Sequence, residues 1–181
     1  MVNSKFKLIM IFLLVTDIIY LGSNRRKQKV SIRLLSKSKV ELKNYVEVDG
    51  CKYFVDNKNV IFETSNKELA IATWLSEELN KTIGIVPVVK QPEGIKTSDY
   101  MIDNEYWDLK EISSNRKDAV YTRIRSGKNQ TTNFIIEISK SKMTMKSARK
   151  QVEALYEHKN YKWLNKIIIK RHGKIEFIKR K

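Results

Sequence analysis

The chain has 181 residues and carries 36 lysines and arginines against 20 aspartates and glutamates, a formal net charge of +16. Its 41% share of hydrophobic residues can bury a core, which excludes a disordered protein, and the single cysteine, Cys51, excludes an internal disulfide framework. A positive excess of this size indicates a polyanionic partner, with nucleic acid first and an anionic membrane surface second.

Residues 1–24 resemble a secretory signal peptide or a membrane anchor. Two lysines precede an uninterrupted apolar run from Leu8 to Val15, and Asp17 then breaks the run. The run is short for a membrane-spanning helix, whereas a basic start before a short apolar stretch is typical of export signals. If this segment acts, the protein is secreted or contacts a membrane through it; otherwise the protein is cytoplasmic.

Residues 25–44 are rich in lysine and arginine and show no clean period, so we interpret them as a basic connector. We assign residues 45–181 to one α/β domain. Its first part alternates apolar and polar residues between turn signals at Asp49-Gly50 and Asp56-Asn57. We expect short strands here over residues 45–48, 51–55 and 59–63.

A helix is predicted over residues 65–81, where Ser65 or Asn66 can cap an apolar face of helical period. A strand follows over residues 83–89. Two further strands, over residues 100–102 and 106–112, are joined by a tight turn at Asp103-Asn104, because these residue types tolerate a positive φ.

The last third of the chain adds the remaining elements. We expect a helix within 115–128, a buried strand over 133–139, an amphipathic helix over 144–159 and a terminal hairpin, 166–170 with 174–178. The whole order predicts an α/β domain of the α+β kind, with a central mixed β-sheet flanked by helices.

Charge is distributed unevenly along this order. Residues 1–40 carry nine basic and one acidic side chain, residues 41–110 carry eight and thirteen, and residues 111–181 carry nineteen and six. A negative pocket beside a positive surface suits a metal-using nuclease, since the pocket holds cations and the surface holds phosphates. An ordinary basic protein with solvated charged faces gives the same totals.

The acidic middle segment contains a candidate catalytic site. A hairpin that turns at Asp103-Asn104 places Asp99 opposite Asp108, and strand alternation points Lys110 to the same face as Asp108. Two carboxylates can bind Mg²⁺ or another divalent cation, and a lysine can orient water and neutralise developing charge. A surface salt bridge between Asp108 and Lys110 is the structural alternative.

These residues resemble the PD-(D/E)xK nuclease motif, here Ser98-Asp99 followed by Asp108-Leu109-Lys110, with serine in place of proline. The resemblance implies Asp99, Asp108 and Lys110 as catalytic residues and Asp99 and Asp108 as metal ligands. It also implies an assisting acid on the first helix. Glu68, Glu77 or Glu78 can fill that place, with Glu68 taken as the third metal ligand.

From about residue 66 onward, "ELAIATWLSEEL", "PEGIKTSDYMIDNEYWDLKEI", "NFIIEIS" and "KIIIK" resemble nuclease domains at the C-termini of bacterial polymorphic toxins and related phage proteins. The CdiA C-terminal tRNase-like group is the nearest of these. The resemblance implies cleavage of RNA, with tRNA favoured over DNA, and an immunity protein as partner.

Two alternatives remain open. Some toxin nucleases resemble the barnase–EndoU–colicin–RelE fold, which cuts RNA without metal through the ribose 2′-OH. The residues that would then contact the phosphate are Lys110, Arg123, Arg125, Lys128 and Thr131. The other alternative is a non-catalytic nucleic-acid-binding module. A phosphate clamp is expected at Arg123, Arg125, Lys128 and Gln130, and a solvated helix face and loop is the structural alternative.

Overall fold

The computed structural model describes residues 39–179. The signal-like segment and most of the basic connector therefore lie outside the described residues. Within the described range, no helix is both long enough and apolar enough to cross a membrane.

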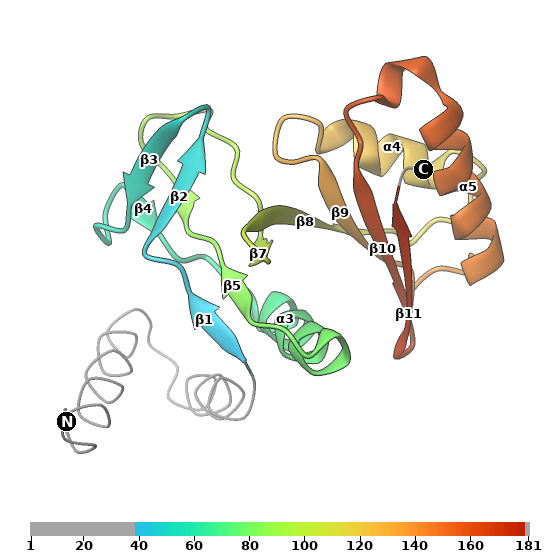
Figure 1. The fold of residues 1–181 in the computed structure, drawn as a ribbon, viewed down its shortest axis with the longest axis horizontal. Coiled ribbons are helices and arrows are strands. Elements are labelled where there is room, and N and C mark those ends of the chain that lie inside the picture. Colours follow the sequence, from blue (N-terminus) through green and yellow to red (C-terminus); the bar gives the residue numbers. More distant parts are fainter. Residues whose placement is uncertain (1–38, 180–181) are drawn as a thin grey trace.

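A seven-stranded mixed sheet is the backbone of the described part of the chain (Figure 1). In spatial order its strands are β1 (Val40–Leu42), β5 (Ile83–Ile85), β7 (Tyr100–Ile102), β8 (Glu105–Glu111), β9 (Asn133–Glu137), β10 (Lys166–Arg171) and β11 (Lys174–Lys179). Strands β8, β9 and β10 are parallel to one another, as are β1 and β5, and the other neighbours are antiparallel. The predicted α+β class with a mixed central sheet is confirmed.

Two small sheets lie outside the main one. Strand β2 (Tyr45–Val48) pairs with β3 (Cys51–Phe54), and β4 (Val60–Ile61) pairs with β6 (Val88–Val89). The single strand predicted over 83–89 was wrong, because its ends join different sheets. Pro87, which has no backbone N–H to donate to a ladder, lies at the break between them.

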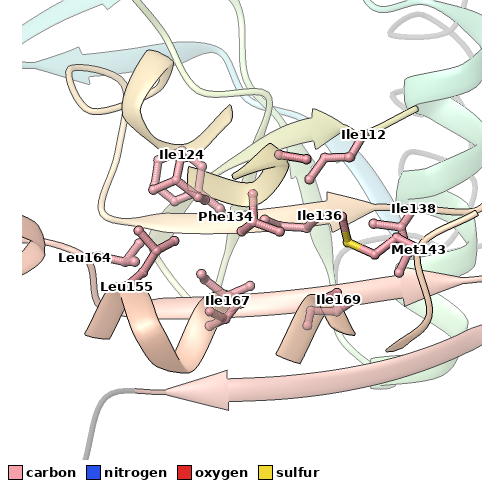
Figure 2. Packing of buried hydrophobic residues seen from close by; sticks show 14 of the residues in the cluster. Ile112, Ile124, Phe134, Ile136, Ile138, Met143, Leu155, Leu164, Ile167 and Ile169 are labelled. Atoms are coloured by element: carbon pink, nitrogen blue, oxygen red, sulfur yellow. The ribbon is translucent and has the colours of Figure 1, made fainter. Parts of the chain in front are cut away.

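The helices cover opposite faces of the main sheet. Helix α3 (Asn66–Leu79) lies beside β5 and β1, whereas α4 (Ala119–Ser126) and α5 (Met145–Glu157) lie on the other side, next to a short 3₁₀ helix, η1 (Lys159–Tyr161) (Figure 1). Alternation along β9 feeds both cores: Ile135 joins the α3 core, while Phe134 and Ile136 join the α4–α5 core with Ile124 (Figure 2).

Strand β1 lies in the segment that the sequence assigned to the connector. Val40, Glu41 and Leu42 pair in parallel with Ile83, Gly84 and Ile85, so the ordered sheet begins before residue 45. Three residues are too few to show a period of two, which explains why the pattern did not reveal this strand.

Candidate active site

The hairpin of β7 and β8 brings two acidic residues together. Its ladder pairs Tyr100 with Trp107, and its turn uses positive φ at Asp103 and Asn104, as predicted. One step beyond the ladder, the backbone N–H of Asp99 donates to the carbonyl of Trp107 at 3.2 Å. The predicted register is confirmed, and it sets Asp99 opposite Asp108; we call these two residues the Asp pair.

Asp108 and Lys110 point to the face that α4 and α5 cover. They pair across the sheet with Phe134 and Ile136, whose side chains belong to the α4–α5 core. Asp108 is 1% exposed, and its Oδ2 lies 2.5 Å from Nζ of Lys110. The structure therefore joins these two residues in a buried ion pair and not in the solvated salt bridge considered above.

The negative charge of the Asp pair is only partly balanced by its surroundings. Burial, then the charges of Asp108 and Glu68, raise the pKa of Asp99 to about 7, although the N–H of Leu109 donates to Asp99 Oδ2 at 2.6 Å. Burial also raises the pKa of Asp108, against the opposing effect of Lys110. Two close carboxylates with a raised pKa are typical of a site that binds a cation or transfers a proton.

Gln130 holds Lys110 in place. Its Oε1 accepts a hydrogen bond from Lys110 Nζ at 2.9 Å, and its Nε2 donates to the carbonyl of Thr97 at 3.0 Å. The hydroxyl of Ser98 in turn donates to the carbonyl of Gln130 at 2.9 Å. Gln130 was expected in a phosphate clamp; the structure places its side chain between the lysine and the segment that leads into Asp99.

Gly127 closes the site from the side of α4, a role that no sequence pattern indicated. A Cβ on Gly127 would lie 2.5 Å from Phe134 Cε1, 2.9 Å from Lys110 Cε and 3.2 Å from Asp108 Oδ2. A glycine just after a helix looks like an ordinary helix end. Its close approach to the Asp108–Lys110 pair is visible only in three dimensions.

The structure distinguishes among the three candidate acids of α3. Glu68 is in the first turn, its charge raises the pKa of Asp99, and its carbonyl accepts a hydrogen bond from Tyr100 OH at 2.8 Å. Glu77 and Glu78 are in the last turn. The carboxylate of Glu68 also completes a capping box, because its Oε2 accepts from the backbone N–H of Ser65 at 2.6 Å.

The donor set fits a divalent ion, although no group of three or more His, Cys, Asp or Glu side chains in residues 39–179 is arranged to hold a metal. Magnesium is commonly bound by one or two carboxylates together with substrate phosphates. The Asp pair supplies two hard oxygen ligands on one face of the sheet. Glu68 would have to leave its capping position to become a third ligand.

The predicted basic residues lie at the end of α4 that faces the site. Arg123 and Arg125 are in its last turn, Lys128 follows Gly127, and all three are exposed. Thr131 is engaged elsewhere, since its hydroxyl donates to the carbonyl of Tyr106 at 2.6 Å. The structure thus places these three basic residues around the end of α4, where their contact with phosphate stays a prediction, and uses Thr131 to fasten strand β8.

Residues 96–175 match the family model of the contact-dependent growth inhibition CdiA C-terminal domain. Among solved structures, the chain is similar to a CdiA-CT/CdiI toxin and immunity complex from Burkholderia pseudomallei, with a TM-score of 0.52 and 17% sequence identity over 77% of this chain and 98% of that chain. No significant match was found among curated proteins. The resemblance to CdiA C-terminal domains is confirmed over residues 96–175, and the similar solved structure supports the same fold. The PD-(D/E)xK motif stays a prediction.

Proposed function

We propose that this chain is a toxin nuclease that hydrolyses phosphodiester bonds in RNA, with tRNA as the favoured substrate and a divalent metal ion as cofactor. One observation carries the proposal: a strongly basic chain places the half-buried Asp99 beside the buried Asp108, with Lys110 on the same face. Carboxylates that face a polyanion repel it, so a module that merely binds nucleic acid gains nothing from them. A hydrolase needs them.

Each residue of the site would have its own role in the hydrolysis. Asp99 and Asp108 would hold Mg²⁺ or a similar ion, which supplies Lewis-acid stabilisation of the charge on the phosphoryl group when it is bound. Lys110 carries a fixed positive charge beside Asp108, where it can orient the attacking water and offset negative charge in the transition state. Gln130 keeps the lysine there, and the exposed Arg123, Arg125 and Lys128 hold the RNA backbone.

We also propose an immunity protein as a partner, because the similar solved structure is described as a toxin and immunity complex. Such a partner must neutralise a basic surface, so an acidic contact face is expected. Contact with a membrane through residues 1–24 stays a prediction of the sequence alone.

A second mechanism has one observation in its favour. A carboxyl whose pKa is about 7, as for Asp99, is well matched to general-base catalysis near neutral pH. Asp99 would then take a proton from the ribose 2′-OH, as in the metal-independent ribonucleases, and no metal would be needed.

The test is cleavage by the purified full chain of total tRNA and of plasmid DNA, each with Mg²⁺, with Mn²⁺ and with EDTA. Asp108→Asn and Lys110→Met are the site variants, and Glu111→Gln is the matched control, since it lies on the same strand but faces α3. RNA cleavage that EDTA and both site variants abolish supports the metal mechanism. RNA cleavage that survives EDTA and leaves cyclic phosphate ends supports the second. Cleavage of neither substrate overturns the nuclease proposal.

A further inference from the structure

A groove between α4 and α5 lies outside the candidate active site. Its volume is about 630 Å³, within the range of ligand pockets, and its lining includes Lys117, Tyr121, Lys150, Gln151 and His158. We call it the α4–α5 groove. Both helices cover the face of the sheet to which Asp108 and Lys110 point, so the groove and the Asp pair belong to the same side of the molecule.

Tyr121 is a fixed aromatic ring at the wall of this groove. It is 37% exposed, and its ring centroid lies 5.2 Å from that of Tyr161, which is 3% exposed. Tyr161 is held in turn by His158 and Trp163, each with its ring centroid 5.7 Å away. A ring that is packed from one side and open on another is a stacking surface for a nucleobase, because every base has an apolar face.

Polar groups around the ring suit a nucleotide. The backbone N–H of Asn160 donates to His158 Nδ1 at 3.2 Å, so in the neutral imidazole the proton is on Nε2, which can donate to a base. Lys117 and Lys150 line the groove and can meet phosphates. The groove also contains Asp118, but the guanidinium of Arg116 lies 3.0 Å from that carboxylate.

Gln151 is part of the wall and is not a free ligand group. Its Oε1 accepts from the N–H of Val120 at 3.1 Å, and its Nε2 donates to the carbonyl of Arg116 at 3.1 Å. These bonds tie α5 to the start of α4. The groove is therefore held open by the fold itself, and base binding does not have to build it.

The distance along α4 matches a short length of RNA. Tyr121 is in the first turn of the helix, and Gly127, just after its end, contacts the Asp108–Lys110 pair. At 1.5 Å per residue these six steps cover roughly 9 Å. That is about two or three nucleotides at the 3.4 Å spacing of a stacked strand. Arg125, in the last turn of α4, lies between the two points.

We propose that the α4–α5 groove binds an unpaired base of an RNA strand, which stacks on Tyr121, while the phosphate two or three nucleotides away lies at the Asp pair. The part that concerns the Asp pair rests on the proposed nuclease function. The groove selects single-stranded segments or loops as substrates, because a base in a duplex is not free to leave its stack.

Binding is measured apart from cleavage. The full chain is titrated by fluorescence anisotropy into a labelled 2′-O-methyl octanucleotide in EDTA, conditions that block both metal-dependent cleavage and attack by a 2′-OH. The second ligand is the same strand with all bases removed, and a free mononucleotide serves as competitor. The variants are Tyr121→Ala, Tyr121→Leu, which keeps apolar packing on Tyr161, and Tyr121→Phe. Phe54→Leu, another exposed aromatic, is the matched control.

Stacking of one base predicts that Tyr121→Ala and Tyr121→Leu weaken binding of the base-bearing strand by about 5- to 100-fold. Tyr121→Phe and Phe54→Leu should stay within about two-fold of the native chain, and the abasic strand should bind all variants equally. Competition by the mononucleotide at concentrations near the strand's own Kd would assign the groove to free nucleotides and overturn the strand proposal. Equal binding of the base-bearing strand by Tyr121→Leu and the native chain would overturn base binding altogether. If the native chain cleaves no nucleic acid but binds the strand in a Tyr121-dependent way, the nuclease proposal is overturned and the base-binding proposal is supported.

Discussion

The part of the sheet formed by β7, β8, β9 and β10 carries charged side chains on both of its faces, and the two sets are built differently. Toward α4 and α5, Asp99 and Asp108 are opposed by Lys110. Toward α3 lies a second set, which we call the α3-face ion pairs. Its members are Glu137 with Lys170, and Glu111 with Lys67 and Lys140.

The difference lies in how well each carboxylate is compensated. Glu137 is 4% exposed, but Lys170 and the N–H of Ser139 hold the pKa of Glu137 below its usual value despite burial. The pKa of Asp99 is raised, because burial and the charge of Asp108 outweigh the Leu109 N–H and Lys110. The pKa of Asp108 is raised as well, because burial outweighs Lys110 and the hydrogen bond with Asp99. A buried carboxylate with its own cation stabilises a fold, whereas two that share a cation are prepared to bind another cation or a proton.

The largest effect expected from this comparison is on catalysis. Lys110→Met should lower the rate of RNA cleavage by about 10²–10³-fold, since it removes the positive charge that the proposed mechanism places at the reacting phosphate. Lys170→Met should leave the rate per folded molecule within about three-fold. Single-turnover cleavage, normalised to the folded fraction from circular dichroism, measures both. Equal losses in the two variants would show that the faces do not differ in function.

Stability should differ within the α3-face ion pairs according to how deeply each pair is buried. Lys170→Met leaves Glu137 buried without its cation and should cost about 3–5 kcal/mol of unfolding free energy. Lys140→Met is the control: its partner Glu111 keeps Lys67, the Lys140 side chain is 67% exposed, and the expected cost is below about 1 kcal/mol. Urea denaturation measures both. A cost of Lys170→Met no larger than that of Lys140→Met would contradict the comparison.

The pH dependence of stability should separate the faces as well. Asp99 has a pKa of about 7 in the folded protein, above its ordinary value of 3.8, so the folded state binds its proton more tightly than the unfolded state does. The stability this provides is complete below pH 4 and is lost as pH rises through 7. Asp99→Asn, which stays neutral, should therefore have a free energy of unfolding roughly 1–3 kcal/mol higher than that of the native chain at pH 8. At pH 5 the two free energies should differ little.

Glu137 should behave in reverse. Its pKa is held below 4.5 in the folded protein, so its contribution to stability is present above pH 4.5 and is lost as pH falls through the lower folded value. Glu137→Gln should accordingly be more destabilising at pH 7 than at pH 3. Thermal melts across pH measure how the stability of Asp99→Asn and of Glu137→Gln, each relative to the native chain, changes with pH. If the two differences changed in the same direction with pH, the assignment of the two faces would be refuted.

The smallest expected effect concerns Glu68, whose carboxylate both completes the capping box of α3 and raises the pKa of Asp99. Glu68→Gln keeps an oxygen for the capping box and removes the charge, so the pKa of Asp99 should fall while stability changes by less than about 0.5 kcal/mol. Glu68→Ala also loses the hydrogen bond from the Ser65 N–H to the carboxylate, while the Ser65 hydroxyl still caps the helix, and should cost about 1 kcal/mol. Carboxyl NMR titration and urea denaturation report the two quantities. An unchanged Asp99 titration in Glu68→Gln would place Glu68 outside the site.

The fold followed from the sequence wherever a period and a boundary residue coincide. Ser65 caps α3 with a capping box, and His172 and Gly173 turn the terminal hairpin at positive φ. Prediction failed where an element depends on distant partners. Strand β1 exists because β5 lies beside it, and the stretch after β5 divides because β6 pairs with β4 and not with the main sheet.

The candidate site divides in the same way. The placement of Asp99, Asp108 and Lys110 on one face was predicted, because a hairpin and strand alternation set it by local geometry. The roles of Gly127 and Gln130 depend on the path from α4 into β9, which no local pattern encodes. Gln130 was read as a contact for nucleic acid, since a polar side chain in a basic segment gives no sign that a lysine from another strand will bind it.

The tight turn at Asp103 and Asn104 also divides the Asp pair between two stretches of chain. Asp99 precedes the turn, whereas Asp108, Lys110 and Gln130 follow it. A chain cut at this turn would give two fragments, neither of which holds a complete site. Their reassembly would restore the pair across one hairpin, so such fragments, fused to other proteins, would report the proximity of their fusion partners.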